Sequence, residues 1–202
     1  LIYRKFLSIL KIYKNLNNNF SIIKWCTQKN ISDKNFYLKI GLRKQENFFK
    51  KNKSFYLSAK IKEKKLDYKM GGMAHLNIIY NLVKYHNPKN ILETGVAFGW
   101  STLVFILAKS LKSDLISIDL SYPTKSSDKL VALAIPSNLK NKFTLLKGID
   151  REYLQNFESQ KKKFDFIHYD SDKSYFGRKK NYDLIWKILK KKGCFISDDI
   201  SD

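Results

Sequence analysis

The chain is poor in several residues that mark common protein classes. Its two cysteines, Cys26 and Cys194, form neither a disulfide framework nor a metal-spaced pair, so a reducing, cytoplasmic compartment is expected. Only four of the 39 basic residues are arginine, which nucleic-acid sites favour for bidentate contacts with bases and phosphates. The longest mainly apolar run, residues 91–108, contains Glu93 and two glycines. These residues argue against a membrane span and favour a soluble protein.

Positive charge, in contrast, is abundant. The formal net charge is +21, and residues 1–66 hold 17 basic and 3 acidic residues, or +14 of that total. A basic surface attracts polyanions and anionic membranes. The scarcity of arginine and the richness in Asn, Ile and Tyr favour the simpler interpretation, in which lysine fills neutral surface positions. A polyanion partner such as RNA remains the alternative.

The composition changes near Asp67, which divides the chain into a basic helical extension (1–66) and a regular domain (67–202). Apolar residues at helical spacing in residues 2–16 predict an amphipathic helix. Such a helix can lie on an anionic membrane, so peripheral membrane contact through residues 1–66 is one hypothesis. Packing of the apolar side on the protein's own domain is the favoured one.

Strands alternate with helices in the regular domain, which has 44% hydrophobic residues to draw on for a core. This alternation predicts an α/β, doubly wound fold with a parallel sheet. The predicted helices are residues 76–86, 100–111 and 181–191, and the predicted strands are residues 90–95, 114–120, 142–148, 164–170 and 193–199.

Every predicted strand ends in acidic residues or glycine. Ligands of such sheets bind outside the carboxyl ends of the strands. An isolated Asp there is often only a turn or helix-cap residue, but the set together favours a site. The residues concerned are Glu93, Gly95 and Gly99 after the first strand, Asp119 after the second, Gly148 and Asp150 after the third, Asp170 and Asp172 after the fourth, and Asp198 and Asp199 after the fifth.

The spacing of the glycines limits the classes of ligand that are expected. The stretch "ETGVAFG" differs from the G-x-G-x-x-G pattern that binds a pyrophosphate. Glycines let a backbone approach a ligand closely, whereas an acid at the strand end repels phosphate. A nucleoside-like, cationic ligand is therefore expected.

The stretches "ILETGVAFGWST", "LISIDL", "FDFIHYDSDKSY" and "GCFISDDI" resemble class I S-adenosylmethionine-dependent methyltransferases over about residues 67–202. The resemblance implies S-adenosylmethionine (SAM) as cofactor. It implies that Asp119 accepts hydrogen bonds from the ribose hydroxyls and that the loop "MGGMAH", residues 70–75, folds over the cofactor. The other implied contacts are Glu93, Gly95 and Gly99, with Trp100 and Ser101 in the same stretch, at the methionine end, Asp150 near the adenine, and Asp172 at the ammonium group.

Three carboxylates, Asp170, Asp198 and Asp199, are expected at neighbouring strand ends. They are the hard ligands that Mg²⁺, Ca²⁺ or Mn²⁺ prefer, and a divalent ion would relieve their repulsion. The stretches "DSDK" and "SDD" are similar to the metal-dependent catechol and caffeoyl-coenzyme A O-methyltransferases, except that Asp199 stands where that family has Asn. By this resemblance Asp170 and Lys173 are catalytic, with Lys173 as the base, and Mg²⁺ is the expected metal.

The stretches "YDSDKSY" and "FISDDI" also resemble bacterial relatives that methylate sugars or antibiotic precursors. The expected reaction is therefore O-methylation of a small hydroxylated molecule. Two alternatives remain open: an RNA-binding or RNA-modifying methyltransferase, and a non-catalytic, membrane-associated scaffold. The family's sheet normally has seven strands, and this sequence ends after the fifth. It is therefore expected to be part of a longer chain, with the fifth strand covered by a homodimer or a partner strand.

Overall fold

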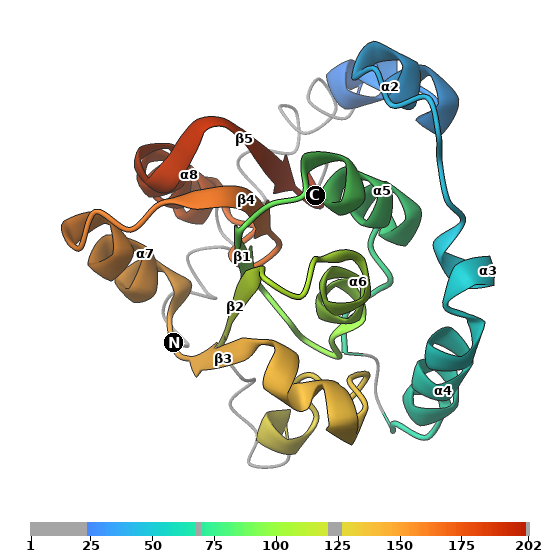
Figure 1. Cartoon of the computed structure of the whole chain (residues 1–202). Helices are drawn as coiled ribbons and strands as arrows, with labels where there is room; N and C mark the ends of the chain where they lie inside the picture. The colour runs from blue at the N-terminus through green and yellow to red at the C-terminus, as the bar shows by residue number, and fades with distance from the viewer. Residues whose placement is uncertain (1–23, 68–69, 121–126, 201–202) are drawn as a thin grey trace.

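The computed structural model describes residues 24–67, 70–120 and 127–200 (Figure 1). Five parallel strands form one sheet in the order β3-β2-β1-β4-β5. This arrangement confirms the predicted α/β, doubly wound class with a Rossmann-like sheet. The strands are β1 (Asn90–Thr94), β2 (Asp114–Asp119), β3 (Thr144–Lys147), β4 (Phe164–Tyr169) and β5 (Leu189–Ser197).

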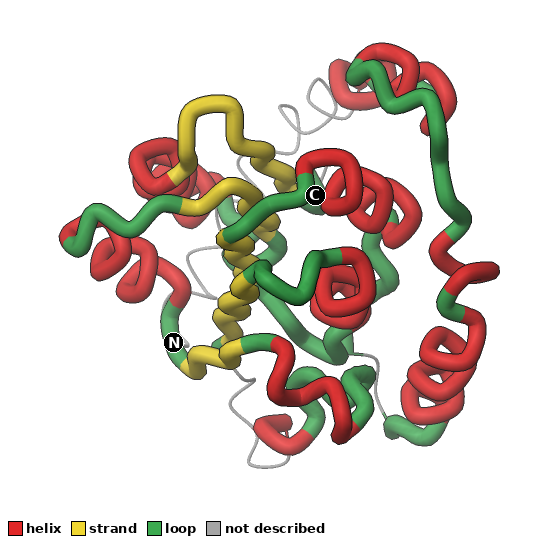
Figure 2. The backbone as a smooth tube through the Cα atoms, in the orientation of Figure 1, coloured by secondary structure: helices red, strands yellow, loops and turns green. Residues whose placement is uncertain are grey.

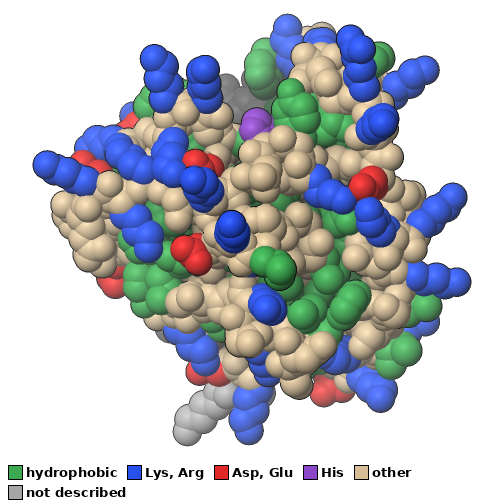
Figure 3. Space-filling view, viewed as in Figure 1, with side chains coloured by type: hydrophobic (Ala, Val, Ile, Leu, Met, Phe, Trp, Pro, Cys, Tyr) green, Lys and Arg blue, Asp and Glu red, His purple; other side chains and the backbone are tan. Residues whose placement is uncertain are grey.

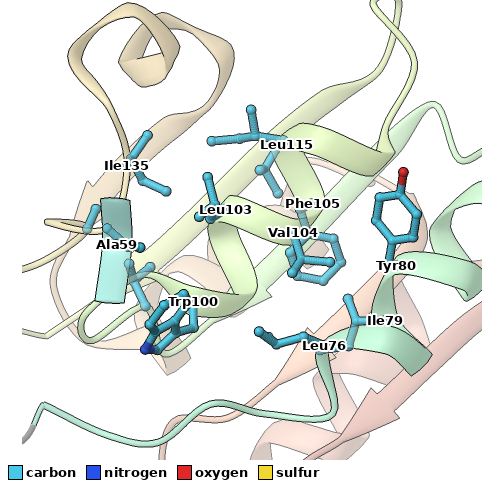
Figure 4. Close-up of a cluster of buried hydrophobic side chains, with 14 of the residues drawn as sticks. Ala59, Leu76, Ile79, Tyr80, Trp100, Leu103, Val104, Phe105, Leu115 and Ile135 are labelled. Atoms are coloured by element: carbon cyan, nitrogen blue, oxygen red, sulfur yellow. The ribbon is translucent and has the colours of Figure 1, made fainter. Parts of the chain in front are cut away.

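Helices lie on both faces of the sheet (Figure 2). Successive residues of a strand point to opposite faces, so each strand contributes side chains to a buried cluster on either side. In β1, Ile91 belongs to one buried cluster and Leu92 to the other, and Phe166 and Ile167 divide in the same way in β4. The first cluster includes α5 (Leu76–His86) and α6 (Trp100–Ala108), and Figure 4 shows part of it. The second includes α7 (Asp150–Ser159) and α8 (Tyr175–Ile188).

The described part of the extension packs against the first cluster. Phe48 and Ala59 are fully buried in it, and the ring centroids of Tyr56 and Trp100 lie 5.7 Å apart. The extension's helices are α2 (Asp33–Lys39), α3 (Phe48–Lys51) and α4 (Lys53–Lys64). The helix predicted at residues 2–16 lies outside the described residues. Within the described part of the chain, no helix has the length and apolar character needed to cross a membrane.

Some predicted boundaries were wrong. Helix α6 ends at Ala108 rather than residue 111, because Lys109 is already extended. Helix α8 begins six residues before its predicted start, and Lys190 and Lys191, predicted as its end, belong to β5. Helix α7 and the short 3-10 helices η1 (Ser127–Lys129) and η2 (Ser137–Lys142) were not predicted.

A glycine explains the missed start of α8. Gly177 lies in its first turn, where glycine is normally unfavourable. A Cβ there would lie 2.1 Å from the Asp172 carboxylate carbon, so any other residue would displace that carboxylate. Ser174 caps the helix by accepting a hydrogen bond from the Gly177 N–H at 3.0 Å.

Candidate active site

The loop between β1 and α6 and the end of β2 form the centre of the carboxyl edge of the sheet. Asp119 Oδ2 accepts hydrogen bonds from the backbone N–H groups of Val96 and Ala97, at 2.7 and 2.8 Å. These two bonds hold the loop against the strand. The second oxygen, Oδ1, has no hydrogen bond to the described residues, so Asp119 retains acceptor capacity on a half-buried side chain.

The glycines of this loop accommodate the protein's own backbone. Gly95 has φ +84°, and a Cβ at this position would lie 2.1 Å from the carbonyl oxygen of Asp170. Gly99 has φ +99°, and its Cβ would lie 3.0 Å from Ala132 Cα. The sequence pattern predicts that these glycines let a ligand approach the backbone closely. The structure gives them a separate role, which is to let three chain segments meet at the carboxyl edge.

Glu93 is buried beneath the loop, with no exposed surface. Its carboxylate accepts hydrogen bonds from Ser101 Oγ at 2.5 Å, Thr102 Oγ1 at 2.7 Å and Ser117 Oγ at 2.7 Å. Burial raises the pKa of Glu93 to about 7, while the three hydroxyl donors oppose the rise. Its carboxylate thus joins β1, β2 and α6 from inside the protein and does not face open space.

Trp100 and Ser101 are also enclosed by protein. Trp100 is 2% exposed, and its indole N–H donates to Glu63 Oε1 of α4 at 2.8 Å. The Ser101 hydroxyl is occupied by Glu93. The loop at residues 70–75 lies against the glycine loop, since a Cβ on Gly71 would be 3.4 Å from Ala97 Cβ. Trp100 and Ser101 therefore fix the helix start, and direct contact with a cofactor stays a prediction for both.

Asp150 takes part in a buried network that sequence analysis did not find. Its Oδ2 accepts from Ser171 Oγ at 2.5 Å and from Asn181 Nδ2 at 2.8 Å. Asn181 is fully buried and also donates to the Tyr169 hydroxyl at 3.1 Å. The network ties α7 and α8 to the turn after β4. Asn181 lies inside a helix with no motif around it, so the sequence offered no signal for this role.

Asp172 shapes the same turn. Its Oδ1 accepts from the Ser174 N–H at 3.0 Å, and its backbone carbonyl accepts from the Tyr169 hydroxyl at 2.7 Å. A side chain that bonds to the backbone two residues ahead is a typical turn-forming Asp. Asp172 thus directs the chain into α8, and its predicted contact with the cofactor's ammonium group stays a prediction.

Asp170, Asp198 and Asp199 follow β4 and β5, as predicted, and Lys173 lies among them. The Lys173 ammonium is 3.4 Å from Asp170 Oδ1 and forms an ion pair with Asp199 Oδ2. Burial raises the pKa of Asp170; Lys173 opposes this rise, and the negative charge of Asp198 adds to it. Arg178 Nη2 donates to the Asp198 carbonyl at 3.4 Å and to the Asp199 carbonyl, which fixes the end of β5.

The predicted ligand set for a metal ion is not preassembled. In residues 24–67, 70–120 and 127–200, no group of three or more His, Cys, Asp or Glu side chains is arranged to hold a metal. The physical reason is the Lys173 ammonium, which bridges Asp170 and Asp199 and neutralises the charge that an ion would neutralise. One feature still suits a cation: Asp170 Oδ1 is buried and has no hydrogen bond within the described residues.

Comparison with known families gives one match. Residues 92–200, more than half of the chain, match the family described as methyltransferase domain. The matched range begins within β1 and contains β2 to β5 together with the acidic residues that follow the strands. Among curated proteins, none matches the sequence.

Solved structures with a similar fold are methyltransferases. An O-methyltransferase from Bacillus cereus in complex with SAH is 19% identical, with a TM-score of 0.56, over 81% of this chain and 71% of that chain. An SAH-bound methyltransferase from Podospora anserina is 15% identical, with a TM-score of 0.60, over 92% and 71%. An O-methyltransferase from Streptomyces achromogenes involved in tomaymycin synthesis, in complex with SAM, is 16% identical, with a TM-score of 0.58, over 83% and 71%.

Proposed function

We propose that this chain, which belongs to the methyltransferase domain family, transfers a methyl group from SAM to an oxygen of a small hydroxylated molecule. The observation that carries the proposal is the convergence at one sheet edge of three features: the glycine loop, Asp119, whose Oδ1 has no hydrogen bond to the described residues, and the Asp170–Lys173–Asp199 cluster. The names of the similar structures support the cofactor and the O-methyl chemistry.

The cofactor would lie across the end of β2. Asp119 Oδ1 is available to accept from a ribose hydroxyl, while Oδ2 keeps the glycine loop in place. SAM carries a sulfonium cation and an ammonium group, so the carboxylates that follow the strands favour it electrostatically. In the reaction the bond from sulfur to methyl breaks, the bond from the acceptor oxygen to methyl forms, and the hydroxyl proton leaves. SAH is the other product.

A divalent cation, with Mg²⁺ as the first candidate, would be held by Asp170, Asp198 and Asp199. Their hard oxygen donors suit it, including the buried Oδ1 of Asp170, whose cationic partner in the structure is Lys173 at 3.4 Å. Asp199 would have to exchange its ion pair with Lys173 for the ion, so binding should be weaker than at a preassembled site. When bound, the cation would make a nearby substrate hydroxyl more acidic.

Lys173 is the proposed base for the hydroxyl proton. As an ammonium it has three donors and no acceptor, so it must lose a proton before it can take one. In the structure its nitrogen is paired with Asp170 and Asp199, and release of Asp199 would remove one of these two contacts. The remaining contribution of the chain is orientation, which places the acceptor oxygen in line with the methyl group.

The substrate class is proposed from the sequence resemblance to bacterial enzymes that methylate sugars or antibiotic precursors, and the similar O-methyltransferase of tomaymycin synthesis supports it. A cytoplasmic location and a homodimer that covers β5, the edge strand of the described sheet, complete the proposal. Contact of residues 1–66 with a membrane is retained as a separate hypothesis, since residues 1–23 lie outside the description.

The test is a calorimetric titration of SAM into the protein with Mg²⁺ present and after chelation. Saturable binding is expected, and Asp119→Ala should weaken it strongly. Asp114→Ala, at the exposed opposite end of the same strand, is the matched control and should bind normally. Unchanged affinity in Asp119→Ala would refute the ribose contact, and no binding by a folded sample would refute the proposed cofactor.

The metal part is tested separately with Asp170→Asn. This variant should retain SAM binding but lose any effect of Mg²⁺ on that binding. Asp183→Asn, which changes an exposed carboxylate in the middle of α8, should keep the Mg²⁺ effect. If Mg²⁺ has no effect on the unmodified protein, the cation is not part of the site and the cofactor assignment stands alone.

A further inference from the structure

The amino edge of the sheet, opposite the candidate active site, concentrates positive charge. Because the strands are parallel, the segments that lead into them share this edge. Residues 86–90, 109–114, 158–165 and 187–193 lead into β1, β2, β4 and β5, and contain ten lysines, no arginine and three carboxylates. The lysines are Lys89, Lys109, Lys112, Lys161, Lys162, Lys163, Lys187, Lys190, Lys191 and Lys192, and the carboxylates are Asp114, Glu158 and Asp165. We call this surface the basic edge.

Two hollows lie on the basic edge, near the starts of β4 and β5. One has a volume of about 370 Å³ and is lined by residues 86–89, 165 and 190–193; the other, of about 340 Å³, is lined by residues 158, 161–163, 187 and 188. Lys190 Nζ lies 2.9 Å from Asp165 Oδ1 in the first hollow, and Lys163 Nζ donates to the Lys187 carbonyl in the second. Figure 3 shows lysine side chains crowded at the upper left, where Figure 1 has α7, α8 and the start of β5.

Apolar side chains project from the same edge. Leu111 and Trp186 are the most exposed large hydrophobic residues in the described part of the chain, at 92% and 74%. Leu111 lies in the turn between α6 and β2, next to Lys112, and Trp186 lies in the last turn of α8, next to Lys187. Tyr85, in the last turn of α5 before the segment that leads into β1, is also exposed.

The opposite edge has the reverse charge. The described residues that follow the strand ends include six aspartates and four basic residues: Asp119, Asp150, Asp170, Asp172, Asp198, Asp199, Lys147, Arg151, Lys173 and Arg178. An extended anionic surface would therefore attract the basic edge and repel the candidate active site. The two edges together would orient the molecule on such a surface.

We propose that the basic edge docks the protein on an anionic phospholipid bilayer. Lysines near such a bilayer are attracted by its negative surface potential, and Trp and Leu can enter the headgroup region beside them. A nucleic-acid surface would use arginine for phosphates and aromatic rings for stacking, whereas the four segments contain no arginine. Docking in this orientation leaves the carboxyl edge open to the solution.

The charge is tested by co-sedimentation with phosphatidylcholine vesicles that contain or lack phosphatidylserine. The protein should bind only the phosphatidylserine vesicles. The triple variant Lys89→Glu, Lys112→Glu and Lys191→Glu should lose at least about 100-fold in partition, since each lysine contributes roughly fivefold. Lys50→Glu, Lys53→Glu and Lys64→Glu, exposed residues of α3 and α4, make the same change in net charge and should bind nearly normally.

The apolar contacts distinguish a bilayer from a nucleic acid. Leu111→Ser with Trp186→Ser should weaken vesicle binding, whereas Leu57→Ser with Ile61→Ser, two exposed residues of α4, should not. Equal loss in both triple lysine variants would overturn the proposal, because net charge alone would then explain binding. Tight binding of single-stranded DNA that the first triple variant abolishes, with no vesicle binding, would overturn it in favour of a nucleic-acid surface.

Discussion

Replacement of Glu93 by Gln should change how stability depends on pH. The pKa of the buried carboxyl is about 7 in the folded protein, compared with an ordinary value of 4.5. The folded state therefore holds a proton that the unfolded state has released between these two values, and stability falls as the pH rises through this window. Each pKa unit corresponds to about 1.4 kcal/mol, so the full effect is roughly 3 kcal/mol.

Glu93→Gln removes this effect, because its amide is of similar shape and cannot ionise. The free energy of unfolding of the variant, relative to the unmodified protein, should rise by roughly 3 kcal/mol between about pH 4.5 and about pH 7.5. Urea unfolding at several pH values, with each midpoint multiplied by its m-value, measures this difference. A difference that stays constant across the window would refute the buried, protonated carboxyl.

The comparison with the variant is necessary because His168 has the opposite effect from Glu93 on how stability depends on pH. Burial lowers the pKa of His168 to about 4, and its Nδ1 lies 4.0 Å from Glu93 Oε1. A depressed histidine pKa makes stability rise with pH over an overlapping window, so the raw curve of the unmodified protein can look flat. Subtracting one curve from the other removes the contribution that the two proteins share.

Three further experiments test the packing of the domain. Gly95→Ala should lower the free energy of unfolding by several kcal/mol, since its Cβ would meet a backbone carbonyl oxygen at 2.1 Å, whereas Gly72→Ala, with nothing within 4 Å, should be neutral in thermal unfolding. Asn181→Leu should cost about 1–3 kcal/mol in urea unfolding, because it leaves Asp150 Oδ2 without one donor. Burial raises the pKa of Cys194 to about 11, so iodoacetamide near neutral pH should label it only after unfolding, as mass spectrometry would show.

The architecture was predictable because hydrophobic periodicity reflects burial on the two faces of a sheet. Helix α5 has its predicted bounds, Leu76–His86, and each strand lies within two residues of its prediction except at the start of β5. Lys190 and Lys191 were predicted as the end of a helix, although they lie in the first residues of the edge strand β5. Helix α7, rich in polar residues, has only Leu154 and Phe157 buried, too few to produce a helical period.

The location of the candidate site was predictable for the same reason, since parallel strands bring their ends to one edge. The roles of individual side chains were not, because a motif does not reveal which way a side chain faces. Glu93 and Asp150, for which a ligand contact is predicted, accept hydrogen bonds from hydroxyl and amide donors of the protein, and no sequence motif indicated these bonds. Asp119 differs because it has an unused oxygen at the strand end. The titration with Asp119→Ala is therefore the most direct test of the site.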